Sequence, residues 1–162
     1  MTEEHYVYVL TDGGEKMSEN KEELKALTIL FRASSSVEKV VKKDMSSHGL
    51  NATEFSVLEL LYNKGRQPIQ MIGKQILLAS SSITYVVDQL EEKKLVSRVA
   101  DKFDRRVTFC ELTEDGNALM DDIFPKHASK IAELFDGCSK EEIENLQSTL
   151  KKVGYRAIDL LD

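Results

Sequence analysis

The sequence predicts a mainly α-helical fold that carries a single small β-hairpin. Apolar residues recur at three- and four-residue spacing along most of the 162 residues, which is the period of an amphipathic helix. Two short stretches rich in β-branched and aromatic residues, 96–99 and 107–112, interrupt this period and predict the hairpin. With only 2 prolines and 8 glycines, little in the composition would break long helices.

The composition is that of one globular domain. An apolar fraction of 41% and a charged fraction of 31% exclude a disordered or collagen-like chain, and 162 residues suffice for a hydrophobic core. No apolar run is long enough to span a membrane, and residues 1–9 lack the basic start and cleavage site of a secretory signal. Two cysteines without a CxxC pattern suit a reducing compartment. We expect a soluble, cytoplasmic protein with no membrane partner.

The first helix is expected to follow an N-terminal extension. We interpret residues 1–16 as this extension, a candidate for disorder that would be absent if translation started at Met17. The residues do not show whether it is ordered. Asn20 and Glu23 fit a reciprocal cap, in which each side chain accepts a hydrogen bond from a free amide of the first turn. The apolar stripe that follows predicts a helix to about Ser47.

Three further helices are expected before the hairpin. Asn51 and Glu54 repeat the cap pattern and begin a helix that Gly65 ends. A short amphipathic segment, 69–76, comes next. The third of these helices is expected to start near Ser80, because serine is a poor residue for a helix interior but a good one for a first turn; Ser80 alone fits a plain cap. Its apolar positions share one face, namely Ile83, Val86, Val87 and Leu90.

Two more helices are expected after the hairpin. The polar, basic segment 101–106 connects the two strands of the hairpin. Thr113 can cap the first of the two helices, and Ser139 with Glu142 forms a second capping box. An apolar stripe then runs almost to the last residue. The predicted order is therefore four helices, a hairpin and two helices.

The net charge of −6 conceals a basic middle segment. Residues 1–63 carry a net charge of −4 and residues 107–162 one of −6, whereas residues 64–106 carry +4. Phosphate binding depends on where basic groups cluster and not on the net charge of the whole chain. An acidic protein of this kind is compatible with a nucleic-acid partner, although a solvated basic face explains the charge equally well.

The order of the elements is the layout of a winged helix-turn-helix: two short helices, the second opening with hydroxyl side chains, and then a basic hairpin. A helix fits the major groove of DNA, and a hairpin tip can place an arginine in the minor groove. We expect Arg98 to contact a phosphate at the base of the wing, and Asp104 to pair with a wing arginine and stabilise the wing. The other candidate DNA-binding residues are Ser80, Ser81, Ser82, Thr84, Tyr85 and Gln89 on the helix and Lys102, Arg105 and Arg106 on the wing.

Several short motifs follow one another at fixed spacing along this part of the chain. They are Ser82-Ile83-Thr84, Asp88-Gln89-Leu90-Glu91, Leu95-Val96-Ser97-Arg98, Asp104-Arg105-Arg106, Leu112-Thr113 and Gly116. With these motifs the chain resembles the MarR (multiple-antibiotic-resistance regulator) family of bacterial transcription factors, and the resemblance covers about residues 20–162. The family usually has glycine where this chain has Lys94, so we expect a left-handed backbone at Lys94, at a small energetic cost.

The resemblance implies a homodimer that binds double-stranded DNA. Residues 17–49 and 113–162 would form a helical dimerisation region, and residues 50–112 a winged helix-turn-helix domain that reads one half of a pseudo-palindromic operator. The implied function is transcription regulation by a repressor, released by a small amphipathic or phenolic ligand at a site the residues do not identify. The apolar last helix independently favours a dimer, because a monomer would leave its stripe exposed.

Two other functions stay open. Cys110 and Cys138 could make the chain a thiol-switch regulator, although neither lies beside a clear cluster of cations that would lower its pKa. The helices could instead form a protein-interaction module that does not bind DNA. The three histidines show no metal-ligand spacing, and the chain has no nucleotide-binding or hydrolase motif. We therefore expect no metal, no cofactor and no enzymatic activity.

Overall fold

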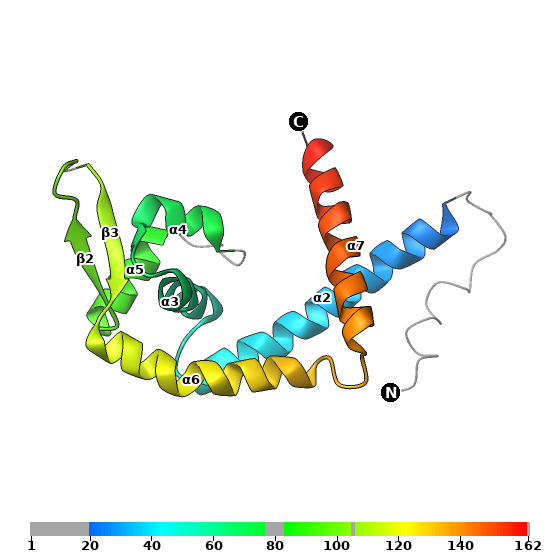
Figure 1. The fold of residues 1–162 in the computed structure, drawn as a ribbon, viewed down its shortest axis with the longest axis horizontal. Helices are drawn as coiled ribbons and strands as arrows, with labels where there is room; N and C mark the ends of the chain where they lie inside the picture. The colour runs from blue at the N-terminus through cyan, green and yellow to red at the C-terminus, as the bar shows by residue number, and fades with distance from the viewer. Residues whose placement is uncertain (1–19, 77–82, 105, 162) are drawn as a thin grey trace.

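The structure is a computed structural model that describes residues 20–76, 83–104 and 106–161. Figure 1 shows a winged region at one end, a long arm formed by α2 and α6, and α7 rising away from that arm. The predicted fold class, mainly α with a small hairpin, is confirmed. The elements are α2 (Lys21–Ser47), α3 (Ala52–Lys64), β1 (Gln67–Pro68), α4 (Ile69–Gln75), α5 (Ile83–Glu92), β2 (Val96–Ala100), β3 (Thr108–Leu112), α6 (Glu114–Glu133) and α7 (Lys140–Asp159).

The sheet contains one more strand than the sequence pattern predicts. Strands β2 and β3 form the expected antiparallel hairpin, in which Val96 lies opposite Leu112 and Ala100 opposite Thr108. The short strand β1 pairs with the other edge of β3, so the order is β1-β3-β2. A strand of two residues is too short to show an alternating pattern, and Pro68 is tolerated there because an edge strand can lack one amide donor.

Two of the three predicted capping boxes are present. At the start of α3, the Glu54 amide donates to the Asn51 side chain and the Asn51 amide donates to the Glu54 carboxylate, each at 2.9 Å. Ser139 and Glu142 make the same reciprocal pair at the start of α7. The box predicted at Asn20 is wrong, because the Asn20 side chain makes no capping hydrogen bond. Its backbone, at φ −110° and ψ 36°, lacks the extended conformation that aims a cap side chain at the first turn.

The hydrophobic core lies in the winged region and fixes the position of α5. Val86, Val87 and Leu90 are buried against side chains of α3, α4 and the sheet, and Met120 and Ile123 of α6 extend the same core. Because these residues occupy one face of α5, the opposite face is left to solvent. Burial of the apolar face thus decides which α5 side chains are available to a partner.

Helix α6 connects the winged region to α2. The His127 ring is buried, and its Nδ1 lies 2.7 Å from a carboxylate oxygen of Asp44 on α2. The same ring lies 4.5 Å, between centroids, from the ring of Phe55 on α3. Nearer the other end of α3, the Tyr62 hydroxyl donates to Asp121 of α6 at 2.7 Å. These contacts join the end of α2, both ends of α3 and the middle of α6 into one unit.

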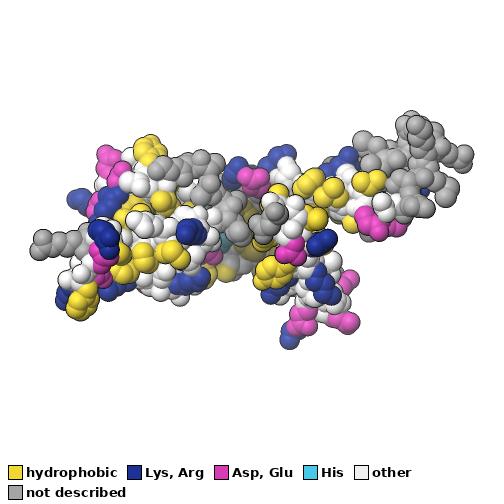
Figure 2. Space-filling view, turned by 90° about the horizontal axis from the view of Figure 1, so that it is seen from above, with side chains coloured by type: hydrophobic (Ala, Val, Ile, Leu, Met, Phe, Trp, Pro, Cys, Tyr) yellow, Lys and Arg dark blue, Asp and Glu magenta, His cyan; other side chains and the backbone are white. Residues whose placement is uncertain are grey.

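Helices α2 and α7 bury almost none of their own side chains. Met45 is the one buried residue of α2, and α7 has none. Figure 2 shows apolar side chains exposed along the arm, to the right of the winged region. The exposed large apolar residues of the two helices are Leu24, Leu27, Ile29, Phe31 and Val37 on α2 and Leu146, Leu150, Val153, Tyr155 and Ile158 on α7.

Candidate nucleic-acid interface

Helix α5 presents a polar face to solvent. Thr84 and Tyr85 are exposed, the Tyr85 side chain to 60%, and Gln89 is half-buried beside them. This is the set that the sequence predicts for a helix reading the major groove, apart from Ser80–Ser82, which lie outside the described residues. The face carries hydrogen-bonding groups and one aromatic ring, so it can contact base edges.

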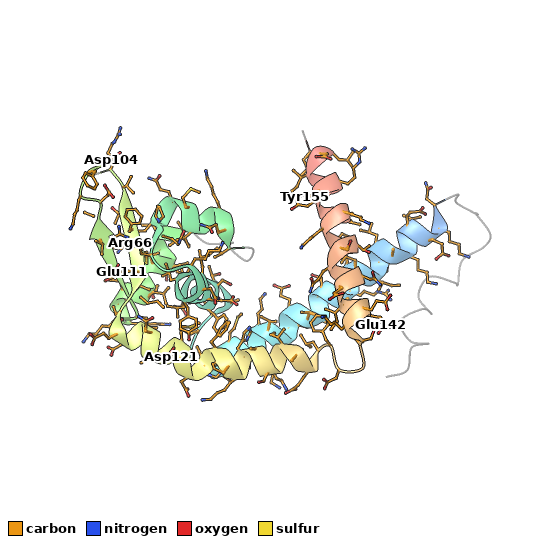
Figure 3. All side chains as sticks on the ribbon, viewed as in Figure 1. Arg66, Asp104, Glu111, Asp121, Glu142 and Tyr155 are labelled. Carbon is orange, nitrogen blue, oxygen red and sulfur yellow. The ribbon has the colours of Figure 1, made fainter. Side chains whose placement is uncertain are left out.

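The tip of the hairpin is a preformed turn built around two aspartates. The Asp101 carboxylate accepts hydrogen bonds from the amides of Phe103, at 2.7 Å, and Asp104, at 2.8 Å. The Asp104 carboxylate in turn accepts from the amide, Nε and Nη2 of Arg106, each at 3.0 Å. Figure 3 shows Asp104 at the far end of the hairpin. Such side-chain acceptors hold a loop in one conformation.

The same hydrogen bonds lower the pKa values of both aspartates. Backbone amides of Asp104 and Phe103 are the main cause at Asp101, and the Arg106 side chain is the main cause at Asp104. A carboxyl group whose pKa is lowered by folding stabilises the protein at pH values above its unfolded-state pKa. This stabilisation is lost as the pH falls through the folded-state pKa. Both carboxylates are therefore ionised at neutral pH, where they hold the turn.

The wing offers exposed cations around this turn. Lys102 is exposed, and the Arg106 side chain remains 90% exposed despite its bonds to Asp104. Arg105 lies outside the described residues. Phe103, between these groups, is 96% exposed, and it is a candidate contact residue that the sequence pattern did not indicate.

Arg66 is a second residue that the sequence pattern missed. Its guanidinium carbon lies 4.7 Å from the centroid of the Phe109 ring on β3. Its charge contributes to the lowered pKa of Asp101. Figure 3 labels Arg66 at the hairpin. Arg66 therefore adds an exposed cation next to the wing. Its place in the basic segment 64–106 was the one signal available, since the pairing of β1 with β3 that brings it there is not local.

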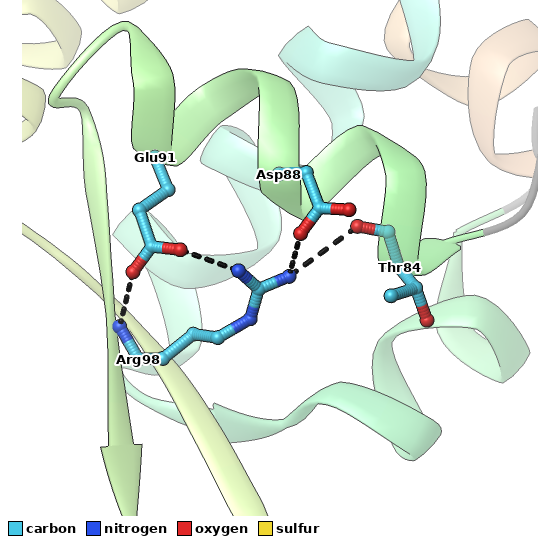
Figure 4. Close-up of polar contacts among 4 residues, drawn as sticks. All are labelled: Thr84, Asp88, Glu91 and Arg98. Carbon is cyan, nitrogen blue, oxygen red and sulfur yellow. Dashed lines mark hydrogen bonds and ion pairs between the residues drawn. The ribbon is translucent and has the colours of Figure 1, made fainter.

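Arg98 lies at the base of the wing, as expected, but its guanidinium is directed at α5. It forms ion pairs with Asp88 and Glu91, and Nη2 also donates to the main-chain oxygen of Thr84 at 3.4 Å (Figure 4). Burial lowers the pKa of Arg98, but the hydrogen bonds that Arg98 donates to Asp88 and Glu91 and the negative charges of these two carboxylates outweigh burial and leave the pKa raised. A phosphate contact by Arg98 would have to replace these intrachain partners.

The turn after α5 packs closely against the start of α6. Lys94 has a φ of 61°, the left-handed conformation expected where the resemblance places a glycine. The Thr113 hydroxyl donates to the main-chain oxygen of Lys94 at 2.6 Å, and the Thr113 amide donates to that of Leu95 at 3.1 Å. Thr113 also accepts from the amide of Gly116, at 3.0 Å, as the predicted cap. These contacts hold the wing and α5 on the end of α6.

The two cysteines differ in environment. Cys110 is buried in β3, and burial raises the pKa of its thiol to about 11, so that this thiol is protonated at neutral pH. Cys138 is exposed in the turn before α7. Within residues 20–76, 83–104 and 106–161, no cluster of three or more His, Cys, Asp or Glu side chains could hold a metal ion. None of the helices in these ranges is long and apolar enough to cross a membrane.

Comparisons with known proteins agree with this arrangement. Residues 50–108 match the model of the MarR family. The chain is 54% identical to the HTH-type transcriptional regulator MhqR of Bacillus subtilis over 83% of this chain and 92% of that protein. The fold matches the crystal structure of AbsC from Streptomyces coelicolor with a TM-score of 0.77 at 20% identity, over 90% of this chain and 99% of AbsC. It also matches Sco3205 of the same organism, solved in complex with DNA, with a TM-score of 0.76 at 20% identity, over 88% of this chain and 91% of Sco3205. The chain belongs to the MarR family of transcriptional regulators.

Proposed function

We propose that this regulator acts as a homodimer that binds a pseudo-palindromic operator in double-stranded DNA and represses transcription. One observation carries the proposal: α5 turns a polar face with an exposed aromatic ring to solvent beside a preformed basic wing tip. In this assignment α5 reads base edges in the major groove through Thr84, Tyr85 and Gln89. The wing supplies phosphate or minor-groove contacts through Lys102 and Arg106.

The exposed apolar side chains of α2 and α7 support the homodimer. The exposed stripes of α2 and α7 would be costly in water, and a second copy of the chain presents the same stripes. We assign residues 17–49 and 113–162 to the dimerisation region and residues 50–112 to the DNA-binding domain. Two linked DNA-binding domains raise affinity for a two-fold operator, because the second half-site is bound at a high effective concentration.

The remaining parts of the proposal follow from family membership. We propose a cytoplasmic protein without catalytic activity, and release from DNA by a small amphipathic or phenolic effector that favours a conformation with unsuitable spacing of the two α5 helices. The direct check is to titrate phenolic compounds into the protein–operator complex and measure the loss of bound DNA. If saturating effector leaves the DNA affinity unchanged, the proposed release by a ligand is wrong, and the proposed DNA binding is unaffected.

The roles of α5 and the wing can be separated by two matched variants. We expect Tyr85→Ala to lower the preference for operator over a scrambled duplex by about tenfold, the size of one lost base contact. Lys102→Ala should weaken binding to both duplexes alike and lower the slope of log affinity against log salt by about one, as expected for one lost phosphate contact. Fluorescence anisotropy with labelled duplexes measures both quantities. Equal behaviour of the two variants would contradict the assignment of α5 to base reading.

A further inference from the structure

Arg98 joins the wing to α5 through one side chain. From β2, its Nη2 pairs with Asp88 and its Nη1 with Glu91, and its own amide donates to Glu91 at 3.3 Å (Figure 4). The contact of Nη2 with the Thr84 oxygen adds a third position on the same helix. Residues 84, 88 and 91 are spaced by four and three, so they lie along one side of α5. The contact therefore holds α5 against β2 at three positions along the helix.

The two carboxylates that accept from Arg98 would oppose DNA binding if no cation were paired with them. Asp88 and Glu91 are partly exposed on the helix that we assign to the major groove. Carboxylates in such a position repel nearby phosphates, and Arg98 lowers the combined charge of the group from −2 to −1. Arg98 itself is only 26% exposed, and both of its terminal nitrogens are already engaged. A phosphate would have to compete with two carboxylates for it.

We propose that Arg98 is a positioning residue for DNA recognition: it holds α5 against the wing and offsets one of the two negative charges of Asp88 and Glu91, and it does not bind a phosphate. This inference replaces the phosphate contact expected from the sequence, and it rests on the proposed DNA-binding function. Its consequence is that Arg98 acts on operator selectivity, because it sets how α5 meets the base edges.

Salt dependence and selectivity distinguish the two roles. We expect Arg98→Ala to lower the preference for operator over a scrambled duplex by about tenfold, because α5 is no longer held against the wing. The two uncompensated carboxylates should weaken binding to both duplexes to a smaller and equal extent, and the salt slope should stay close to wild type because no phosphate contact is lost. Lys102→Ala is the matched control, because it removes one exposed cation of the same wing. If Arg98→Ala instead weakens both duplexes equally and lowers the salt slope by about one, Arg98 is a phosphate contact and the proposal is wrong.

A mutant cycle with the two acceptors gives an independent test. The variant D88N/E91Q makes the chain more positive. We nevertheless expect it to lose its preference for the operator, because the ion pairs that hold α5 against the wing are gone. In that background Arg98→Ala should cost less than about twofold, because interacting residues are not additive. A phosphate contact predicts the opposite: D88N/E91Q frees Arg98 and strengthens binding, and Arg98→Ala then costs at least as much as in the wild type.

Folding and the underlying function are controlled separately. Circular dichroism melts of each variant identify unfolding, and Arg98→Lys keeps one ion pair, so its operator preference should fall between those of wild type and Arg98→Ala. If the wild-type protein binds no operator, the proposed function itself is wrong. If the wild-type protein binds operator and Arg98→Ala behaves like Lys102→Ala, only the positioning role of Arg98 is wrong.

Discussion

Replacing Gly116 with alanine is expected to destabilise the fold by about 3 kcal/mol, the upper part of the usual range for overpacking a buried site. A Cβ at this position would lie 2.0 Å from the main-chain oxygen of Leu95 and 3.3 Å from a methyl group of Leu112. Because the nearest obstacle is backbone, no side-chain rotation relieves the clash. The turn at Lys94-Leu95 or the start of α6 must move, and both position the wing.

Thermal unfolding followed by circular dichroism measures this effect. For a chain of this length, 3 kcal/mol corresponds to a fall in Tm of roughly 6–12 °C. Gly73→Ala is the matched control: its Cβ would lie 3.6 Å from Ile83, an ordinary contact, and alanine favours a helix interior by up to about 1 kcal/mol. A Gly116→Ala protein as stable as Gly73→Ala would mean that α6 does not pack on this turn as described.

Introducing a charge into the stripe of α7 is expected to separate the dimer and abolish tight DNA binding. Leu150→Glu places a carboxylate in the middle of that exposed stripe, between Leu146 and Val153. A buried, unpaired charge at an interface is strongly unfavourable, so the variant should sediment as a monomer. Loss of the second half-site should then weaken operator binding by at least about 100-fold.

Ser148→Glu is the control for this variant, because it adds the same charge two residues away, on the side of α7 opposite Leu146, Leu150 and Val153. It should remain a dimer and bind operator like the wild type. Analytical ultracentrifugation, followed by anisotropy titration, measures both steps. If Leu150→Glu also remains a dimer, α7 does not form the dimer contact.

Features that depend on neighbours in sequence were predictable from the sequence. The capping boxes that begin at Asn51 and Ser139 each require only a glutamate three residues later in the sequence, and both are present. The left-handed backbone at Lys94 was expected because the resemblance places a glycine there, at the end of a helix, and it is present. The same local rule failed at Asn20, where the backbone ahead of α2 has a different conformation. A side-chain pattern states which cap can form, but the preceding backbone decides whether it does.

Features that depend on distant partners were not predictable in this way. Strand β1 exists only because β3 offers a free edge, and this pairing brings Arg66 over Phe109. The sequence placed Arg98 correctly at the base of the wing. The direction of its side chain follows from the packing of α5 against β2, which puts Asp88 within its reach. A basic residue in a basic segment suggests a contact with a DNA phosphate. The tertiary fold instead places the Asp88 carboxylate where it competes with a phosphate for the guanidinium.

Recognition of DNA by the winged helix is tested most directly by a titration of labelled duplexes from the region upstream of the protein's own gene. Wild-type protein and Arg106→Ala are compared at two salt concentrations, with a scrambled duplex as reference. We expect selective wild-type binding that weakens steeply with salt, and weaker binding by Arg106→Ala, because that variant removes an exposed wing cation. Wild-type binding without selectivity or salt dependence, or a variant indistinguishable from wild type, would contradict recognition of DNA by this winged helix.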